Sequence, residues 1–133
     1  MVIKHALSGH ALQRALAIEQ LGDPQNFELA GSLWRGRILM ELLEDSYAAN
    51  RLLAFQALSK LDDFREWEFD YLAPEPQRRE SIRRARDLWK RADTPQRQQE
   101  IQRVLGTTSP TETDEAVRKL ISNRNQVPMG ILE

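Results

Sequence analysis

Helix start signals recur along this chain, and they constrain its fold more than any other feature. Three capping residues each stand directly before a proline, in the pairs Asp23-Pro24, Thr94-Pro95 and Ser109-Pro110. A short oxygen-bearing side chain accepts a hydrogen bond from an N–H of the first helical turn, and proline suits the next position because its missing N–H would have no helical partner. Gly22 and Gly106 each follow a leucine at the end of an apolar pattern, as glycines that stop helices do. The sequence therefore predicts several separate helices.

The apolar residues repeat at intervals of three and four, which is the spacing of one buried helix face. The strongest pattern lies in residues 33–61, where the predicted core stripe is Leu39, Leu42, Leu43, Ser46, Ala49, Leu53 and Ala57. Trp34 and Phe55 widen the apolar surface beyond this stripe. A helix that is apolar over much of its circumference is central to a bundle or buried in an oligomer.

We therefore predict an all-α fold, a compact bundle of five or six helices around a long central apolar helix. Gly31 and Ser32 either interrupt this helix near its start or leave it continuous over residues 24–61. The other expected helices cover residues 8–21, 77–91, 95–105 and 110–122. Residues 64–71 alternate aromatic and charged side chains, which fits a short helix or an extended edge.

A length of 133 residues is typical of one domain, so we expect residues 1–133 to form a single all-helical domain. Residues 73–76, Ala-Pro-Glu-Pro, are the candidate hinge because each proline disfavours helical geometry in the residue before it. Weak periodicity predicts a mobile tail over residues 123–133.

Aromatic and basic residues are distributed unevenly. Eight of the nine aromatic residues lie between Phe27 and Tyr71, whereas residues 77–103 hold one, Trp89, beside nine Arg or Lys and four Asp or Glu. Residues 1–73 hold seven cations against eleven carboxylates, and residues 74–133 hold twelve against nine. An acidic, apolar front half is therefore followed by a basic helix, although the net charge of the whole chain is only −1.

The basic helix expected over residues 77–91 is the strongest candidate for function. At 100° per residue, cations spaced by four, three and four residues line one face. The candidate partner-binding residues on this helix are Arg79, Arg83, Arg84, Arg86, Lys90 and Arg91. Such a face can neutralise phosphates or meet an acidic protein surface, including the front half of a second copy. An ordinary charged face, diluted by Glu80 and Asp87, is the competing interpretation.

Catalytic and metal-binding signals are weak. The absence of cysteine excludes disulfides, thiolate chemistry and zinc fingers, and His5 and His10 are too far apart for two helical metal ligands. Glu41, Glu44 and Asp45 share a face of the expected helix and could bind a divalent ion or act as an acid–base pair. We assign no catalytic residue, no metal ligand and no cofactor.

The last two expected helices, with the turn at residues 106–109, have the layout of a helix-turn-helix. Glu112, Asp114 and Glu115 stand at the start of the second helix, where phosphates would repel them. These carboxylates suit the positive end of the helix dipole instead, so a plain helical hairpin is favoured.

These patterns lead to three function hypotheses. The leading one is a non-catalytic helical binding or adaptor protein, a homo-oligomer in the cytoplasm, that contacts a macromolecular partner through its basic helix. The alternative is a nucleic-acid-binding small subunit or regulator. The second alternative is a metal protein or enzyme based on the carboxylates. No apolar run is long enough to span a membrane, so we expect no membrane partner. No small-molecule site is evident from the sequence.

Overall fold

The fold of the chain is all-α, as predicted. The computed structural model describes residues 2–22, 34–92 and 94–122. Its elements are α1 (Val2–Ser8), α2 (Ala11–Gly22), α3 (Arg35–Leu42), α4 (Ala48–Ser59), the short 3-10 helix η2 (Asp62–Phe64), α5 (Glu75–Arg91), α6 (Pro95–Leu105) and α7 (Pro110–Ser122). The described residues thus hold seven α-helices, more than the five or six expected, and no strand. The predicted start at Asp23-Pro24, the interruption at Gly31 and Ser32 and the tail over residues 123–133 lie outside the described residues.

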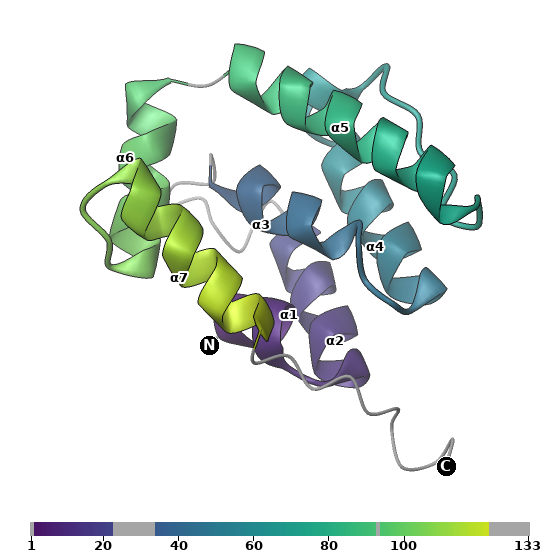
Figure 1. Ribbon diagram of the computed structural model, residues 1–133, viewed down its shortest axis with the longest axis horizontal. Coiled ribbons are helices and arrows are strands. Elements are labelled where there is room, and N and C mark those ends of the chain that lie inside the picture. Colours follow the sequence, from purple (N-terminus) through teal and green to yellow (C-terminus); the bar gives the residue numbers. More distant parts are fainter. Residues whose placement is uncertain (1, 23–33, 93, 123–133) are drawn as a thin grey trace.

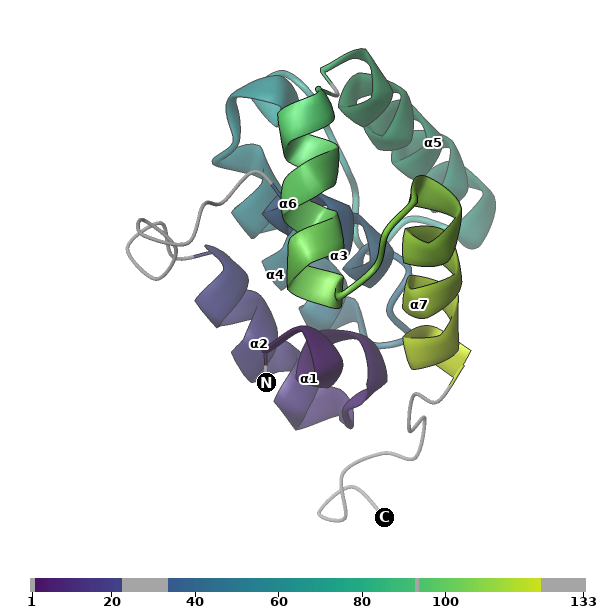
Figure 2. The same ribbon diagram turned by 90° about the vertical axis from the view of Figure 1, so that its left-hand side faces the viewer.

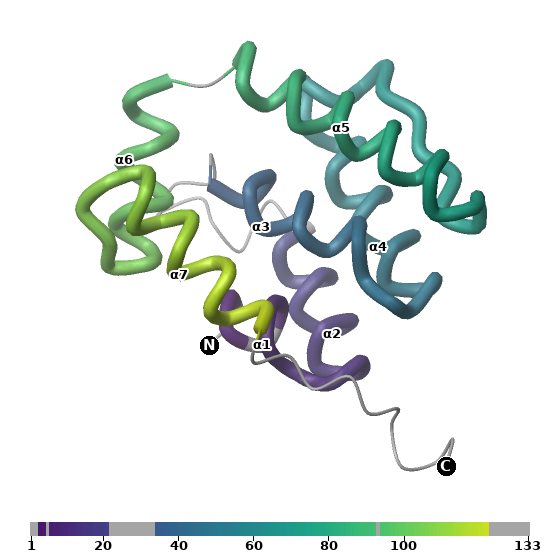
Figure 3. The backbone as a smooth tube through the Cα atoms, viewed as in Figure 1, coloured from purple at the N-terminus to yellow at the C-terminus, as the bar shows by residue number. Residues whose placement is uncertain are grey.

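Helix α3 lies in the middle of the bundle, and the other helices surround it (Figure 1). Helix α2 packs against α1 and α4, while α5 packs on α3 and on η2. The hairpin of α6 and α7 closes one end, where α7 also contacts α1 (Figure 2). The chain path in Figure 3 shows how the last helix returns to lie beside the first.

The core is concentrated around α3, because almost every side chain from Trp34 to Leu43 is buried. Only Arg37 and Glu41 of this stretch remain partly accessible. This burial explains why the apolar residues extend around the helix instead of forming one stripe. Leu58 of α4 and Phe64 of η2, both fully buried, pack into the same core, to which the other helices also contribute.

The prediction of one long central helix was wrong: α3 ends at Leu42 and α4 begins at Ala48. The cause is Asp45, whose carboxylate is fully buried against Arg14 of α2, with Nε–Oδ2 and Nη2–Oδ1 distances of 2.6 and 3.0 Å. Asp45 Oδ1 also accepts a hydrogen bond from the N–H of Tyr47 at 2.9 Å, a local turn that competes with helix. Consequently Ser46 and Ala49, both predicted on the core stripe, are exposed.

The helix expected over residues 8–21 corresponds to α2, which begins three residues later than expected, and the sequence analysis did not predict α1 before it. His10 provides the start signal of α2, because its Nδ1 accepts a hydrogen bond from the N–H of Gln13 at 3.3 Å. The Gln13 side chain accepts one in return from the N–H of His10 at 3.1 Å. This reciprocal cap gives His10 a structural role.

Residues 65–71 form no regular helix after η2. Their alternation places aromatic rings inward and charged side chains outward, so Trp67 and Phe69 are buried while Glu66 and Glu68 are exposed. The rings of Trp67 and Phe69 stack at 5.6 Å, and Phe64 meets Trp67 edge-on at 5.8 Å. The segment thus covers the core with its aromatic side.

Helices α6 and α7 have the predicted bounds, because local hydrogen bonds determine them. Thr94 Oγ1 accepts from the N–H of Arg97 at 3.1 Å, and Ser109 Oγ accepts from the N–H of Glu112 at 3.1 Å. Gly106 ends α6 in the left-handed conformation, at φ 71°. Helix α5 begins at Glu75, inside the proline segment, and a hinge at residues 73–76 stays a prediction.

The hydrogen bonds at the N-terminal cap of α7 predict a change in the pKa of Glu112 that a titration can measure. The backbone N–H and then the hydroxyl of Thr108, both 2.8 Å from Glu112 Oε2, lower the pKa of the Glu112 carboxyl. A lowered folded-state pKa means that the stabilisation is present above the unfolded-state value, about 4.3, and is lost as the pH falls through the folded-state pKa. In a carboxyl NMR titration, we expect Thr108→Val, which lacks the hydroxyl donor, to raise the pKa of Glu112. An unchanged pKa would show that this hydroxyl bond is absent in solution.

Candidate functional site

Helix α5 covers the basic stretch and begins two residues before the expected start, and its cations point to different surroundings. Ile82 and Ala85 of α5 are buried, which fixes the orientation of the helix on the bundle. The exposed cations are Arg79, Arg83, Arg84, Lys90 and Arg91, whereas Arg86 is partly buried. The six predicted residues therefore do not form one uniform surface.

Three of the outward arginines are paired with carboxylates of their own helix. The ion pairs are Arg79–Glu75, Arg83–Glu80, Arg83–Asp87 and Arg84–Glu80, with N–O distances of 2.5, 2.6, 2.9 and 3.6 Å. The hydrogen bond from Arg83 lowers the pKa of Glu80, and the same bond raises the pKa of Arg83. Exposed pairs of this kind add little stability, but they reduce the positive field of the outer face of α5.

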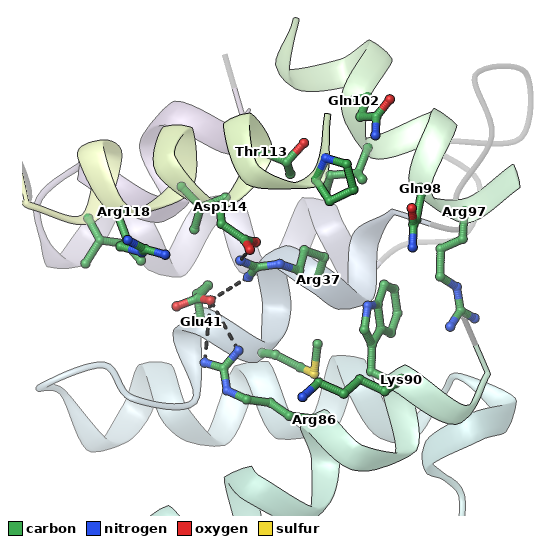
Figure 4. Close-up of a pocket in the computed structure, with 16 residues that line it drawn as sticks. Arg37, Glu41, Arg86, Lys90, Arg97, Gln98, Gln102, Thr113, Asp114 and Arg118 are labelled. Atoms are coloured by element: carbon green, nitrogen blue, oxygen red, sulfur yellow. Dashed lines mark hydrogen bonds and ion pairs between the residues drawn. The ribbon is translucent and has the colours of Figure 1, made fainter. Parts of the chain in front are cut away.

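Arg86 turns away from this outer face and reaches α3. Its Nη1 lies 3.4 Å from Glu41 Oε1, and its Nη2 lies 3.4 Å from Glu44 Oε2. Glu41 also accepts a hydrogen bond from Arg37, whose Nη2 lies 3.3 Å from Asp114 of α7. This chain of charges links α5, α3 and α7 (Figure 4).

A groove of about 670 Å³ lies beside these charges, between α3, α5, α6 and α7; we name it the α5–α7 groove. Its apolar lining consists of Met40, Trp89, Ile101, Val117, Ile121 and Pro110. Its cations are Arg37, Arg86, Lys90, Arg97 and Arg118, and its carboxylates are Glu41 and Asp114. Of the described residues that line the groove, five are therefore cationic and two are anionic. The groove is therefore an apolar surface with an excess of positive charge around it.

Two of the groove cations are available to a partner. Lys90 and Arg118 are exposed, and among the residues that the structure describes neither has a carboxylate within ion-pair distance. They extend from α5 and α7 respectively (Figure 4). Arg97, in contrast, pairs with Asp63 at 2.9 Å and lies over the ring of Trp89 at 4.0 Å.

Trp89 forms the α5 wall of the groove and packs inward against α3. Its ring lies directly against Gly36 of α3 and stacks on Phe64 with a centroid distance of 6.5 Å. A side chain at position 36 would collide with the ring. The absence of a Cβ there brings α5 close to α3 and defines the width of the groove at this point.

Sequence reasoning found Arg86 and Lys90 but missed Arg37, Arg97 and Arg118. A signal for the α7 wall was present, because Thr113, Val117 and Ile121 repeat at four residues and form a narrow apolar stripe. The meeting of this stripe with α5 depends on tertiary packing, which one sequence does not display.

The acidic residues considered for metal binding are separated by the break after α3. Glu41 and Glu44 face Arg86, whereas Asp45 is buried on the other side against Arg14. Among residues 2–22, 34–92 and 94–122, no group of three or more His, Cys, Asp or Glu is placed to hold a metal ion.

Comparison of the chain with protein-family models, with curated proteins and with solved structures gave no match. None of the described helices combines the length and the apolar character that a bilayer-spanning helix needs. Function is therefore inferred from the groove itself.

Proposed function

We propose that this chain is a non-catalytic helical binding protein and that the α5–α7 groove receives a protein partner. The observation that carries the proposal is the pairing of an apolar floor with two exposed cations, Lys90 and Arg118, that lack a carboxylate partner in the described part of the chain. Protein interfaces combine an apolar centre, rich in aromatic residues and Arg, with a polar rim. The described lining of the groove has an apolar centre with one aromatic ring, Trp89, and four arginines.

A protein partner suits the groove better than a nucleic acid does. A phosphate backbone is bound by unpaired cations that follow it, yet Arg79, Arg83 and Arg84 meet carboxylates of α5. Inside the groove, the apolar floor offers a phosphate backbone no hydrogen-bond donor. A partner that carries both apolar side chains and carboxylates satisfies the floor and the cations together.

The lining also favours binding over catalysis. No His, Cys or Ser is among the described residues that line the groove, and its two carboxylates, Glu41 and Asp114, are each ion-paired with Arg37. Arg37 and Arg86 are held by Glu41, an arrangement that stabilises the walls.

Site-specific photo-crosslinking tests the location of the site. Gln102 lines the groove from α6, whereas its neighbour Arg103 is exposed and does not line it. We expect a photoreactive residue at position 102 to form a protein adduct in a lysate of the native host, and the same residue at position 103 to form none. The adduct should be sensitive to protease and resistant to nuclease. Equal labelling from both positions, or a nuclease-sensitive adduct, would refute the proposal.

A matched pair of double variants tests the charges. Lys90→Glu with Arg118→Glu reverses the two groove cations, and Arg91→Glu with Lys119→Glu makes the same charge change at neighbouring positions outside this groove. We expect the first variant to weaken binding of the crosslinked partner by about tenfold, as loss of two charge contacts implies, and the second to change it by less than about twofold. Equal weakening by both would move the site to the outer face of α5. If the partner is a second copy of the chain, light scattering of the two variants will show it as the predicted homo-oligomer.

A further inference from the structure

We infer that the partner segment is an acidic amphipathic α-helix of about three turns; the inference rests on the proposed function and specifies what enters the groove. The first reason is the length of the α7 wall. Its lining residues are Pro110, Thr113, Asp114, Val117, Arg118 and Ile121, which repeat at three and one residues along the helix. From Pro110 to Ile121 there are eleven rises of 1.5 Å, so the wall is about 16 Å long, the length of three helical turns.

The second reason is the form of the walls. Helix α5 contributes Arg86, Trp89 and Lys90. Helix α3 contributes Arg37, Met40 and Glu41 at the same i, i+3 and i+4 spacing. The groove is thus bounded by ridges of helical side chains, between which a further helix packs with its own ridges. An amphipathic helix laid into such a groove is a common mode of peptide recognition.

Other modes of peptide recognition find less support in the described residues. Addition of an extended peptide needs an exposed sheet edge, and no strand is present in residues 2–22, 34–92 or 94–122. Proline-rich peptides bind between several aromatic rings, whereas Trp89 is the one aromatic side chain among the described groove residues. A helix is the secondary structure that matches this lining.

The third reason is the placement of charge. Lys90 extends from the α5 wall and Arg118 from the α7 wall, so exposed cations stand on both sides of the apolar floor (Figure 4). A bound helix that turns its apolar stripe to Ile101 and Val117 would bring its flanking positions toward these cations. Carboxylates at those positions are attracted, and lysines or arginines there are repelled. The complementary helix is therefore acidic.

Selection from a random library tests the chemistry of the occupant. The probe is a library of 16-residue peptides displayed on phage, selected on the immobilised full chain. We expect enrichment of sequences with apolar residues at i, i+3 or i+4 and i+7 and with a negative net charge. Enrichment of basic, proline-rich or alternating extended sequences, or no enrichment at all, would overturn the inference.

Binding of one selected peptide then tests its conformation and its location. By fluorescence anisotropy, we expect a central proline in the peptide to weaken binding more than tenfold, because proline breaks the helix interior. Lys90→Glu with Arg118→Glu should weaken binding by roughly tenfold, and Arg91→Glu with Lys119→Glu by less than about twofold. Insensitivity to the proline would overturn the helical form. Equal loss in both protein variants would overturn the location.

The two proposals fail in different ways. If a residue at position 102 crosslinks a native protein while the selected peptides are not acidic helices, the groove is a binding site and only the nature of its occupant is wrong. If position 102 captures nothing and no peptide is enriched, both the proposed function and this inference are wrong.

Discussion

Replacing Asp45 with Asn is expected to lower the free energy of unfolding by about 3–5 kcal/mol, the cost of breaking a buried ion pair from one side. Arg14 and Asp45 both have fully buried side chains, and two hydrogen bonds of 2.6 and 3.0 Å join them. Asparagine keeps an oxygen that can accept the hydrogen bond from the Tyr47 N–H, so the loss reports the missing charge rather than the missing turn. Urea unfolding followed by circular dichroism measures it.

The partner variant and the double variant supply the control. Arg14→Met is expected to cost a similar amount, because it leaves the Asp45 carboxylate buried without the guanidinium. Arg14→Met with Asp45→Asn should be clearly more stable than the sum of the two losses implies, since burying two charges carries a desolvation cost that their attraction barely offsets. Additive losses in this double-mutant cycle would mean that the pair is not formed in solution.

The same ion pair explains why sequence periodicity predicted the central segment incorrectly. The three-and-four spacing correctly placed Leu39, Leu42 and Leu43 in the core. It continued through Ser46 and Ala49 because spacing alone does not reveal that Asp45 turns inward to a residue 31 positions away. A polar run, Glu44-Asp45-Ser46, inside an apolar segment was the available signal.

Where hydrogen bonds between neighbours decide the structure, the prediction from sequence was correct. Thr94, Gly106 and Ser109 act within their own turns, and α6 and α7 have the predicted bounds for that reason. The ion pairs inside α5 follow the same logic, since Glu75–Arg79 and Arg83–Asp87 have the spacing of neighbours on a helix. The six cations of the basic helix could be found from sequence, but their division into outer and groove-facing sets could not. That division depends on which face of α5 packs on α3.

The contact of Trp89 of α5 with Gly36 of α3 gives the second large effect. Trp89→Ala is expected to lower the free energy of unfolding by about 3 kcal/mol, near the lower end for aromatic truncation because the ring is only partly buried. The truncation removes the stacking on Phe64, the contact with Gly36 and the ring beneath Arg97. The same substitution opens the α5 wall of the groove. We therefore expect the variant also to bind an acidic peptide more weakly.

Gly36→Ala is expected to change stability in opposite directions in two backgrounds. This difference separates the effect of packing against Trp89 from the effect of helix propensity. In the natural chain, the new Cβ would overlap Cζ3 of Trp89 and lie 3.0 Å from Cε3, so the ring must shift and stability should fall by about 1–3 kcal/mol. In the Trp89→Ala background the obstacle is gone, and Gly36→Ala should stabilise the chain by up to about 1 kcal/mol because alanine favours helix over glycine. Urea unfolding of the four chains measures both steps. A loss of equal size in both backgrounds would show that something other than the Trp89 ring requires glycine at position 36.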